Sequence, residues 1–255
     1  VAGARDLTKL ADLADRGVRT ARVDYDDPAS LNAALADVES VLLISASEPG
    51  KRFAGHKNVI DAAAAANVSK LVYTSAPKAT TFEWALGAEH KATEEAIAAS
   101  GVPAVIVRNN WYIENYLPDV QRAAESGVIA ASVGEGLIAA ASRADFAEGA
   151  AVVLLEDGHI GEVYEFAGDT RIDYDAVAAG AAEVLGRDVA YVRVSTDDHI
   201  AALEGAGLDA DTARFVAGID TGIREGVLDV DDNTLSRLIG RPTTPFVEGL
   251  RAALA

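Results

Sequence analysis

Aromatic and amide side chains gather in one short run of the chain, from Asn109 to Tyr116. The run reads Asn-Asn-Trp-Tyr-Ile-Glu-Asn-Tyr, in a chain of 255 residues of which only 6% are aromatic. Aromatic faces combined with a few polar groups suit the binding of a planar ring. A packed crossover between two lobes would use similar residues. We favour the binding site and expect Trp111 and Tyr112 to border its reactive end, with Tyr112 as a candidate catalytic residue.

Small polar residues end two consecutive apolar runs. Ser45, Ala46 and Ser47 follow Val41–Ile44, and Thr74 with Ser75 ends the run that begins at Lys70. Ligands of open parallel sheets bind at the carboxyl ends of the strands, so these residues are candidates for lining a binding cleft. Ordinary turn formation is the competing explanation, because Ser and Thr are common in turns.

Arg5 directly follows the short apolar segment Val1–Ala4. In a nucleotide-binding sheet, an arginine at this position accommodates the 2′-phosphate of NADP, whereas an acidic residue binds the 2′-hydroxyl of NAD. The alternative is a solvated arginine at a helix start. Asp6, its neighbour, is expected to cap the following helix.

His90 is the one histidine expected near the ligand edge of the sheet. It stands in Glu89-His90-Lys91, at the start of a helix where ordinary short-chain dehydrogenases carry Tyr-x-x-x-Lys, a motif that this chain lacks. A histidine there could donate a proton, so His90 is the second candidate catalytic residue. A surface histidine at a helix start is the competing interpretation.

Composition argues against several classes of function. The chain has 22 basic and 40 acidic residues, a net charge of −18, which disfavours nucleic acid and anionic membranes as partners. It has no cysteine, and its four histidines lie far apart, so we expect no metal site. Without a long apolar run or a signal peptide at its start, the sequence predicts a cytoplasmic protein.

Strand-like and helix-like patterns alternate along the first two-fifths of the chain. Such alternation predicts an α/β fold with a doubly wound parallel sheet. Asp27 is expected to cap a helix that begins at Pro28. The strands are expected at Val1–Ala4, Val18–Val23, Val41–Ile44, Lys70–Ser75 and Pro103–Arg108.

The alternation loosens after Asn115. We expect a hairpin from Gly127 to Ala141, short strands at Val163–Phe166 and Val189–Val192, and mostly helix from Ala176 onward. The sequence therefore predicts a Rossmann-like domain over residues 1–115 and a smaller α+β substrate lobe over 116–255, with chain crossings back to the sheet.

The chain opens on what reads as the second strand of such a sheet. In a doubly wound sheet the first strand lies at the centre, beside the point where ligands bind. We therefore expect a βα unit of roughly 30 residues before Val1. The central position of the sheet is then expected to be vacant, or filled by something outside this sequence.

Several of these stretches together resemble the NmrA-like atypical short-chain reductases, especially their bacterial quinone-reductase branch. The resemblance covers nearly the whole chain. Its most specific part is Arg108–Tyr116, and weaker matches include Leu42–Glu48, Ser142–Phe146 and Leu238–Thr244. The glycine-rich loop of the family, which cradles the pyrophosphate at a helix start, is absent.

The resemblance implies two lobes with an NADP(H) cleft between them and two-electron reduction of quinones by hydride transfer. Triphenylmethane dyes are an alternative substrate. The sequence leaves the oligomeric state open, with a homodimer as one possibility. The proton for the product could come from solvent or from a weak acid. The cofactor contacts that we predict from strand ends and from the resemblance are Arg5, Asp24, Ser45, Ala46, Ser47, Thr74, Ser75, Asn110, Trp111, Tyr112, Ile113, Glu114, Asn115 and Arg143.

A second function stays open. Some NmrA-like proteins bind the dinucleotide and then a regulatory protein, without catalysis. The absent Tyr-x-x-x-Lys is compatible with such a redox sensor, whereas the aromatic run favours the enzyme.

Overall fold

The computed structural model of the chain describes residues 1–48 and 50–255 and divides them into two compact units. Pro49, part of the predicted polar turn, lies outside the described residues. The first unit comprises Val1–Ser75, Glu89–Ile106 and Val153–Val163, and the second comprises Ala76–Ala88, Val107–Val152 and Tyr164–Ala255. The single boundary expected at residue 115 stays a prediction.

Parallel strands organise the first unit. Strand β1 (Ala2–Ala4) pairs with β2 (Thr20–Arg22), and β3 (Ser40–Leu43) pairs with β4 (Lys70–Ser75). The larger sheet has the order β3-β4-β5-β7, in which β5 is Ala104–Asn109 and β7 is Val163–Phe166. Every residue of β4 is buried, as expected for a strand covered on both faces. The predicted α/β fold with parallel strands is therefore confirmed.

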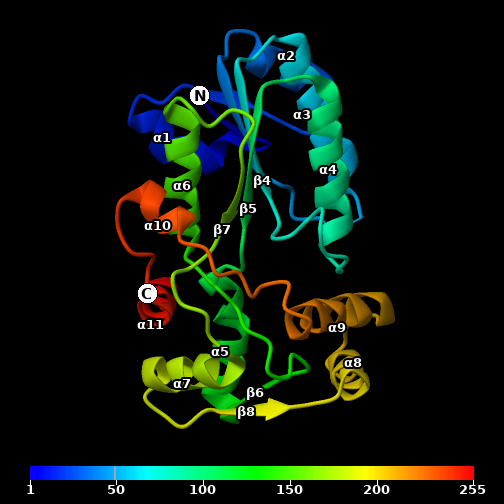
Figure 1. The fold of residues 1–255 in the computed structure, drawn as a ribbon, viewed down its shortest axis with the longest axis vertical. Helices are drawn as coiled ribbons and strands as arrows, with labels where there is room; N and C mark the ends of the chain where they lie inside the picture. Colours follow the sequence, from blue (N-terminus) through cyan, green and yellow to red (C-terminus); the bar gives the residue numbers. More distant parts are fainter. Residues whose placement is uncertain (49) are drawn as a thin grey trace. The chain divides into compact units, whose positions relative to one another are not determined.

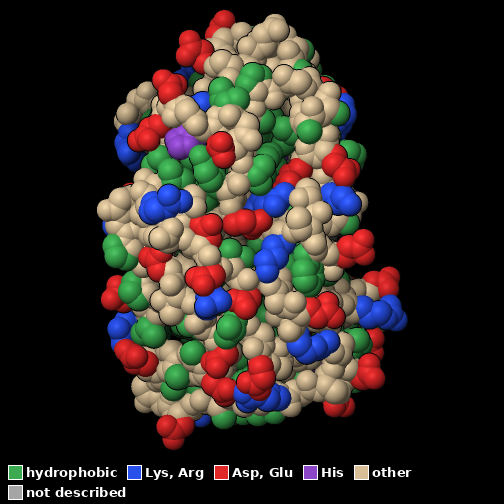
Figure 2. Space-filling model, viewed as in Figure 1, with side chains coloured by type: hydrophobic (Ala, Val, Ile, Leu, Met, Phe, Trp, Pro, Cys, Tyr) green, Lys and Arg blue, Asp and Glu red, His purple; other side chains and the backbone are tan. Residues whose placement is uncertain are grey.

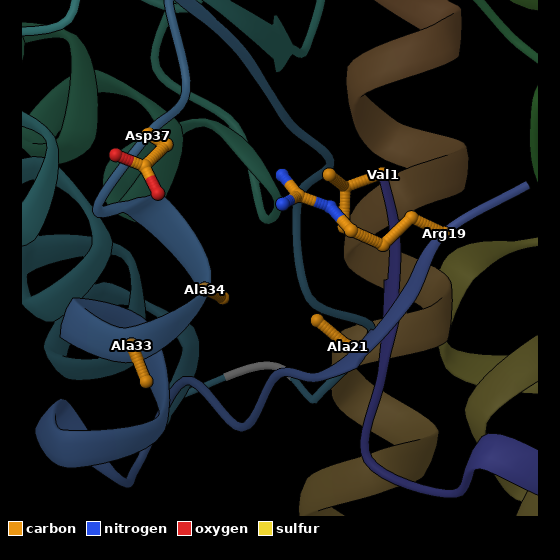
Figure 3. A pocket seen from close by; sticks show the side chains of 6 residues that line it. All are labelled: Val1, Arg19, Ala21, Ala33, Ala34 and Asp37. Carbon is orange, nitrogen blue, oxygen red and sulfur yellow. The ribbon is translucent and has the colours of Figure 1, made fainter.

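The pair β1-β2 stays separate from the larger sheet. No strand of the described residues joins β1 to β3. The expected vacancy at the centre of the sheet stays a prediction. A cavity of about 180 Å³ lies beside the pair and is lined by Val1, Arg19, Ala21, Ala33, Ala34 and Asp37 (Figure 3).

The helices of the first unit follow local signals. Asp27 accepts hydrogen bonds from the N–H groups of Ala29 and Ser30, so it caps α2 (Pro28–Leu35) as predicted. Helices α3 (Arg52–Ala65) and α4 (Gly87–Ser100) lie side by side along the sheet (Figure 1). Gly55 of α3 faces Tyr25, and a Cβ at this glycine would lie 3.0 Å from the Tyr25 Cβ. The close approach of Tyr25 to α3 therefore favours a glycine there. The segment before α2 forms a short 3-10 helix, Leu7–Leu10, and α1 (Ala11–Asp15).

A buried lysine fastens the end of α6 (Arg143–Leu155) to β4. The Lys70 ammonium donates to the carbonyl oxygens of Val153 and Leu154, both at 3.2 Å, and of Glu156 at 2.5 Å. The last carbonyls of a helix carry partial negative charge and lack partners inside the helix, so a cation stabilises them. Lys70 thereby holds the returning segment Val153–Val163 in the first unit.

The second unit has its own apolar core. Its largest fully buried side chains include Ile113, Tyr116, Ile138 and Leu228. Its elements are the 3-10 helix η2 (Ile113–Tyr116), α5 (Leu117–Ser126), β6 (Val128–Ala131), α7 (Tyr174–Leu185), β8 (Ala190–Arg193), α8 (Thr196–Gly205), α9 (Ala210–Arg224), α10 (Thr234–Ile239) and α11 (Phe246–Leu254).

The predicted hairpin over Gly127–Ala141 is wrong. Strand β6 pairs in parallel with β8, with Val128 opposite Ala190, and Ile138 instead forms an antiparallel bridge with Ile172. The prediction took Gly136 as a sign of a hairpin turn, but this glycine is explained by a close packing contact. A Cβ at Gly136 would lie 2.5 Å from the Ile223 carbonyl oxygen, so this position needs a glycine whether or not the turn closes a hairpin.

Acidic side chains are spread over the face of the molecule shown in Figure 2 rather than gathered in one patch. In the part of the chain that the structure describes, no helix combines the length and apolar character needed to cross a membrane. The same residues contain no group of three or more histidine or carboxylate side chains placed to hold a metal ion.

Candidate active site

The polar turn after β3 is held by side chains from two other elements of the first unit. The Ser45 N–H donates to Thr74 Oγ1 of β4 at 2.9 Å, and the Ala46 N–H donates to His56 Nε2 of α3 at 2.9 Å. Ser45 and Ala46 are half-buried and Ser47 is exposed. The structure thus brings together the two strand ends, at Ser45 and at Thr74, that the sequence singled out separately.

Behind this turn lies a group of buried side chains that we call the histidine network: Arg52, His56, Tyr73, His90 and Thr93. His56 is fully buried, and its Nδ1 lies 3.0 Å from Thr93 Oγ1. His90 places Nε2 3.0 Å from Arg52 Nη1 and Nδ1 2.8 Å from the Tyr73 hydroxyl. These bonds connect α3, β4 and α4.

Both histidines of the network are held neutral. Burial and, next, the Arg52 charge lower the pKa of His56 to about 4 and that of His90 to about 3. Burial also raises the pKa of the Tyr73 hydroxyl above its usual value. A group that stays uncharged throughout the neutral range and is fully hydrogen-bonded is suited to fixing a structure rather than to exchanging protons.

His90 therefore differs from the surface residue that a helix start suggested. It is 5% exposed, and both ring nitrogens have partners. The arrangement favours a positioning role. Proton donation by His90 stays a prediction that this geometry does not support.

Ser75, the last residue of β4, is also engaged. Its hydroxyl donates to Glu94 Oε1 of α4 at 2.6 Å, and only 4% of the residue is exposed. The Ser75 oxygen can still accept a hydrogen bond, and Thr74, whose oxygen accepts from the Ser45 N–H, can still donate its hydroxyl hydrogen. The predicted contacts of both residues with the cofactor stay predictions.

Arg5 is exposed at the end of β1, and its guanidinium forms no ion pair with the described residues. Asp6 turns to the following 3-10 helix, where its carboxylate accepts from the Thr8 N–H at 3.0 Å. This is the capping role expected for Asp6, and hydrogen bonds from Thr8 lower its pKa. The carboxylate thus points at the helix start and leaves the charge of Arg5 unopposed.

Asp24, the predicted cofactor contact after β2, is half-buried and engaged within its own segment. Its carboxylate pairs with Arg22 at 3.3 Å and accepts from the Asp26 N–H at 3.2 Å. Its predicted contact with the cofactor stays a prediction.

In the second unit, the aromatic run leaves β5 and turns into η2. Asn110 is 4% exposed and uses its amide within the protein, accepting from the Trp111 N–H at 2.7 Å and donating to the Leu228 carbonyl at 3.2 Å. The Ile113 side chain lies in the apolar core. The Asn115 N–H donates to the Tyr112 carbonyl at 3.0 Å. Asn110 and Ile113 thus shape the segment, and their predicted contacts with the cofactor are untested.

Tyr112 stands among polar and charged side chains that we call the tyrosine group: Asn109, Tyr112, Glu114 and Arg143. The Arg143 guanidinium lies 5.3 Å from the Tyr112 ring centroid. Asn109 Nδ2 donates to the Tyr112 hydroxyl over a long 3.4 Å. The Glu114 carboxylate accepts from the Arg143 N–H, with its two oxygens at 3.0 and 3.1 Å, and thereby caps α6.

The tyrosine group retains unused hydrogen-bonding capacity. Asn109 Oδ1 is buried and has no partner, and the Tyr112 hydroxyl donates to no atom of the described residues. The Arg143 side chain is exposed and forms no ion pair within the same residues. Buried acceptors without partners are rare in folded proteins and call for an explanation such as a ligand.

Sequence reasoning missed Arg52, His56 and Thr93, and it left Asn109, the first residue of the aromatic run, off the list of predicted contacts. Asn109 ends a strand whose carboxyl end was already singled out, so its position was a usable signal. The other three stand inside helices, where their types and spacing carry no distinctive pattern. A second cavity, of about 510 Å³, is lined by Gly168, Asp169, Arg171, Val230, Asp231, Asp232 and Asn233, and none of these was predicted as a site residue.

Comparison with known proteins gives matches along most of the chain. The family model described as NAD(P)H-binding matches residues 1–157. Quinone oxidoreductase 2 of Escherichia coli K12 is 44% identical over 250 residues, which cover 98% of this chain and 87% of that protein.

Solved structures also match over nearly the whole chain. The crystal structure of an NADPH-dependent quinone oxidoreductase from Escherichia coli, complexed with NADPH, superimposes with a TM-score of 0.94 at 42% identity and covers 99% of this chain and 89% of that one. The Citrobacter triphenylmethane reductase complexed with NADP(H) gives a TM-score of 0.90 at 31% identity and covers 98% and 89%.

Proposed function

Since this chain belongs to the NAD(P)H-binding family of NmrA-like reductases, we propose that it is an oxidoreductase that reduces quinones by two electrons at the expense of NADPH. The observation that carries the proposal is the 44% identity to quinone oxidoreductase 2, which extends over 98% of this chain. Likeness of this extent includes the segments that hold the candidate site.

The residues present fit a phosphorylated, planar cofactor. Arg5 and Arg143 present exposed guanidinium groups without ion-pair partners among the described residues, in a chain whose net charge is −18. Guanidinium groups bind phosphates through paired, charge-assisted hydrogen bonds. We assign the 2′-phosphate of NADPH to Arg5, because Arg5 follows the strand whose end meets the adenosine ribose in this fold class.

Asn109 Oδ1 is a further point of fit. It is a buried acceptor without a partner in the described part of the chain, at the carboxyl end of a parallel strand, where ligands of such sheets bind. An amide or hydroxyl donor on the ligand would satisfy it. The remaining predicted contacts, from Asp24 through Asn115, are part of the same proposal.

NADPH supplies the hydride when bound, and one proton must follow to give the hydroquinone. We assign this proton to the Tyr112 hydroxyl. Asn109 Nδ2 donates to its oxygen, which leaves the hydroxyl hydrogen free for an acceptor.

In this proposal the protein accelerates the reaction chiefly by positioning the nicotinamide ring against the quinone ring. Quinones accept hydride readily, so the protein chiefly needs to hold the two rings together, and correct orientation alone can lower a barrier substantially. Trp111 and Tyr112 are the ring-bearing side chains proposed to border the reaction. A cytoplasmic location and a homodimer belong to the same proposal, as predicted from the sequence.

The test is to follow nicotinamide absorbance with NADPH, then NADH, and a panel of quinones, with a triphenylmethane dye as a further acceptor. We expect NADPH oxidation that depends on the quinone. Binding of NADPH without oxidation by any acceptor would overturn the proposal and would support the redox sensor.

A further inference from the structure

The backbone of the turn after β3 is fixed at three consecutive residues by side chains from elsewhere in the first unit. The Tyr25 hydroxyl donates to the Ile44 carbonyl at 3.0 Å, Thr74 receives the Ser45 N–H, and His56 receives the Ala46 N–H. Of these three side chains, only His56 can change its hydrogen-bonding character by moving a proton.

The hydrogen bonds determine where the proton of His56 lies. Thr93 has one hydroxyl hydrogen, which it donates to the Glu89 carbonyl at 2.8 Å. Toward His56 Nδ1, Thr93 Oγ1 therefore acts as the acceptor, and Nδ1 must carry the hydrogen. Nε2 then has a free lone pair, which is what the Ala46 N–H requires.

The ring has little freedom to leave this orientation. His56 is fully buried and makes edge contacts with the rings of Tyr25 and Tyr73, at centroid distances of 6.2 and 5.5 Å. The neighbouring charged groups are Arg52 on the same helix and Glu89 on α4, which lie 3.3 Å apart and pair with each other. A second proton on Nε2 would face the Ala46 N–H and is therefore disfavoured.

We propose that His56 is a positioning residue that, as the neutral Nδ1–H tautomer, sets the conformation of the Ser45–Ser47 turn and thereby the affinity for NADPH. The second part rests on the proposed function, in which this turn contacts the cofactor. His56 itself is buried behind the turn and touches neither reactant.

A pair of isosteric substitutions separates the two ring nitrogens. In His56→Gln the terminal amide oxygen reaches the place of Nε2 and still accepts from Ala46, whereas in His56→Asn the shorter amide reaches only the place of Nδ1. We expect H56Q to keep the Kd for NADPH within about threefold and H56N to raise it about tenfold, the worth of one hydrogen bond, with kcat at saturation little changed.

Two measurements need no cofactor. Nitrogen-15 NMR of the imidazole should show the proton on Nδ1, and amide hydrogen exchange at Ala46 should be slow in the unsubstituted protein and in H56Q but at least tenfold faster in H56N. If H56N fails to fold, the tautomer and the exchange rates of the other two proteins still decide. A proton on Nε2, fast exchange at Ala46 in the unsubstituted protein or in H56Q, or exchange in folded H56N as slow as in the unsubstituted protein, would overturn the role of His56.

The outcomes also separate this inference from the proposed function. Faster exchange at Ala46 with an unchanged Kd for NADPH would remove the turn from the cofactor contacts and overturn the inference about affinity. That result would leave the proposed function standing, because the unsubstituted protein would still oxidise NADPH with a quinone. Loss of the proposed function would instead appear as absence of turnover in the unsubstituted protein.

Discussion

The histidine network of the first unit and the tyrosine group of the second differ in how completely their polar atoms are used. In the network, both nitrogens of His56 and of His90 have partners, and Arg52 Nε, which donates no hydrogen bond, lies 3.3 Å from the Glu89 carboxylate. In the tyrosine group, among the residues that the structure describes, Asn109 Oδ1 has no partner and the Tyr112 hydroxyl donates to none.

This difference separates two kinds of polar cluster that look alike in a list of residue types. A cluster whose donors and acceptors satisfy one another is stable without a ligand, so it can hold a backbone in place. A cluster with unused capacity gains free energy when a ligand arrives. We therefore expect substitutions in the tyrosine group to act on turnover, and those in the histidine network to act on stability and affinity.

Tyr112→Phe gives the largest expected effect. Removal of the hydroxyl leaves water as the proton source, so we expect kcat to fall about a hundredfold, the usual worth of a positioned acid. Tyr191→Phe is the matched control, because within the described part of the chain the Tyr191 hydroxyl bonds only to the backbone carbonyls of Ala131 and Gly134. Steady-state kinetics with a saturating quinone measures both, and equal rates in the two variants would remove the acid from the tyrosine group.

Arg5→Ala tests the other unpaired charge. Loss of the charge-assisted bonds to a 2′-phosphate, roughly 1.5–3 kcal/mol, should raise KM for NADPH about ten- to a hundredfold and leave that for NADH nearly unchanged. Arg16→Ala, also exposed and unpaired within the described residues, serves as the control. If the KM values for NADPH and NADH rose equally, Arg5 would have only a structural role.

The histidine network should respond to acid through stability. The unfolded chain protonates His56 and His90 below about pH 6.5, whereas the folded chain resists until about pH 4 and about pH 3. The unfolded state then binds more protons, so the free energy of unfolding falls as the pH drops through this window, by roughly 1.4 kcal/mol per pH unit for each histidine.

Urea denaturation at pH 7.5 and pH 5.5 measures this loss, and His90→Asn should remove about half of it. The pH profile of turnover above pH 5.5 should keep its shape in the same variant. An inflection near pH 6.5 that His90→Asn abolishes would restore His90 as a proton donor.

Glu114→Gln gives the smallest expected effect. Glu114 is the satisfied member of the tyrosine group, and its charge faces the start of α6. The amide oxygen can still accept from the Arg143 N–H, so only the favourable interaction with the helix dipole is lost, about 0.5 kcal/mol. Thermal unfolding should show a midpoint lower by about 1–2 °C. A tenfold loss of kcat would instead place Glu114 in the reaction.

The elements that the sequence predicts well are those whose signal is local. The buried strand Lys70–Ser75 reads as a largely apolar run because both of its faces are covered, and Asp27 caps the helix that begins at the next residue, Pro28. The parallel pairing of β6 with β8 was missed because its partner lies some sixty residues along the chain.

The candidate site shows the same limit. The strand ends at Ser45 and Thr74 and the aromatic run are local patterns, and the comparisons support the function inferred from them. The bond from His56 to Thr93 joins residues 37 apart. No spacing rule in the sequence predicts such a pair. The burial of His90 is equally hard to predict, because it depends on which face of α4 packs against the sheet.

Lys70 adds a consequence for how the chain acquires its fold. The carbonyl groups that its ammonium requires lie 83, 84 and 86 residues further along the sequence. While the chain is being synthesised, the first unit therefore has a buried cation without acceptors until the end of α6 has emerged. Contacts of such long range slow folding, because the intervening loop must close before they form. Lys70 therefore reaches its final contacts only after the end of α6 has formed, and a fragment that stops before residue 153 should be less stable than the whole chain.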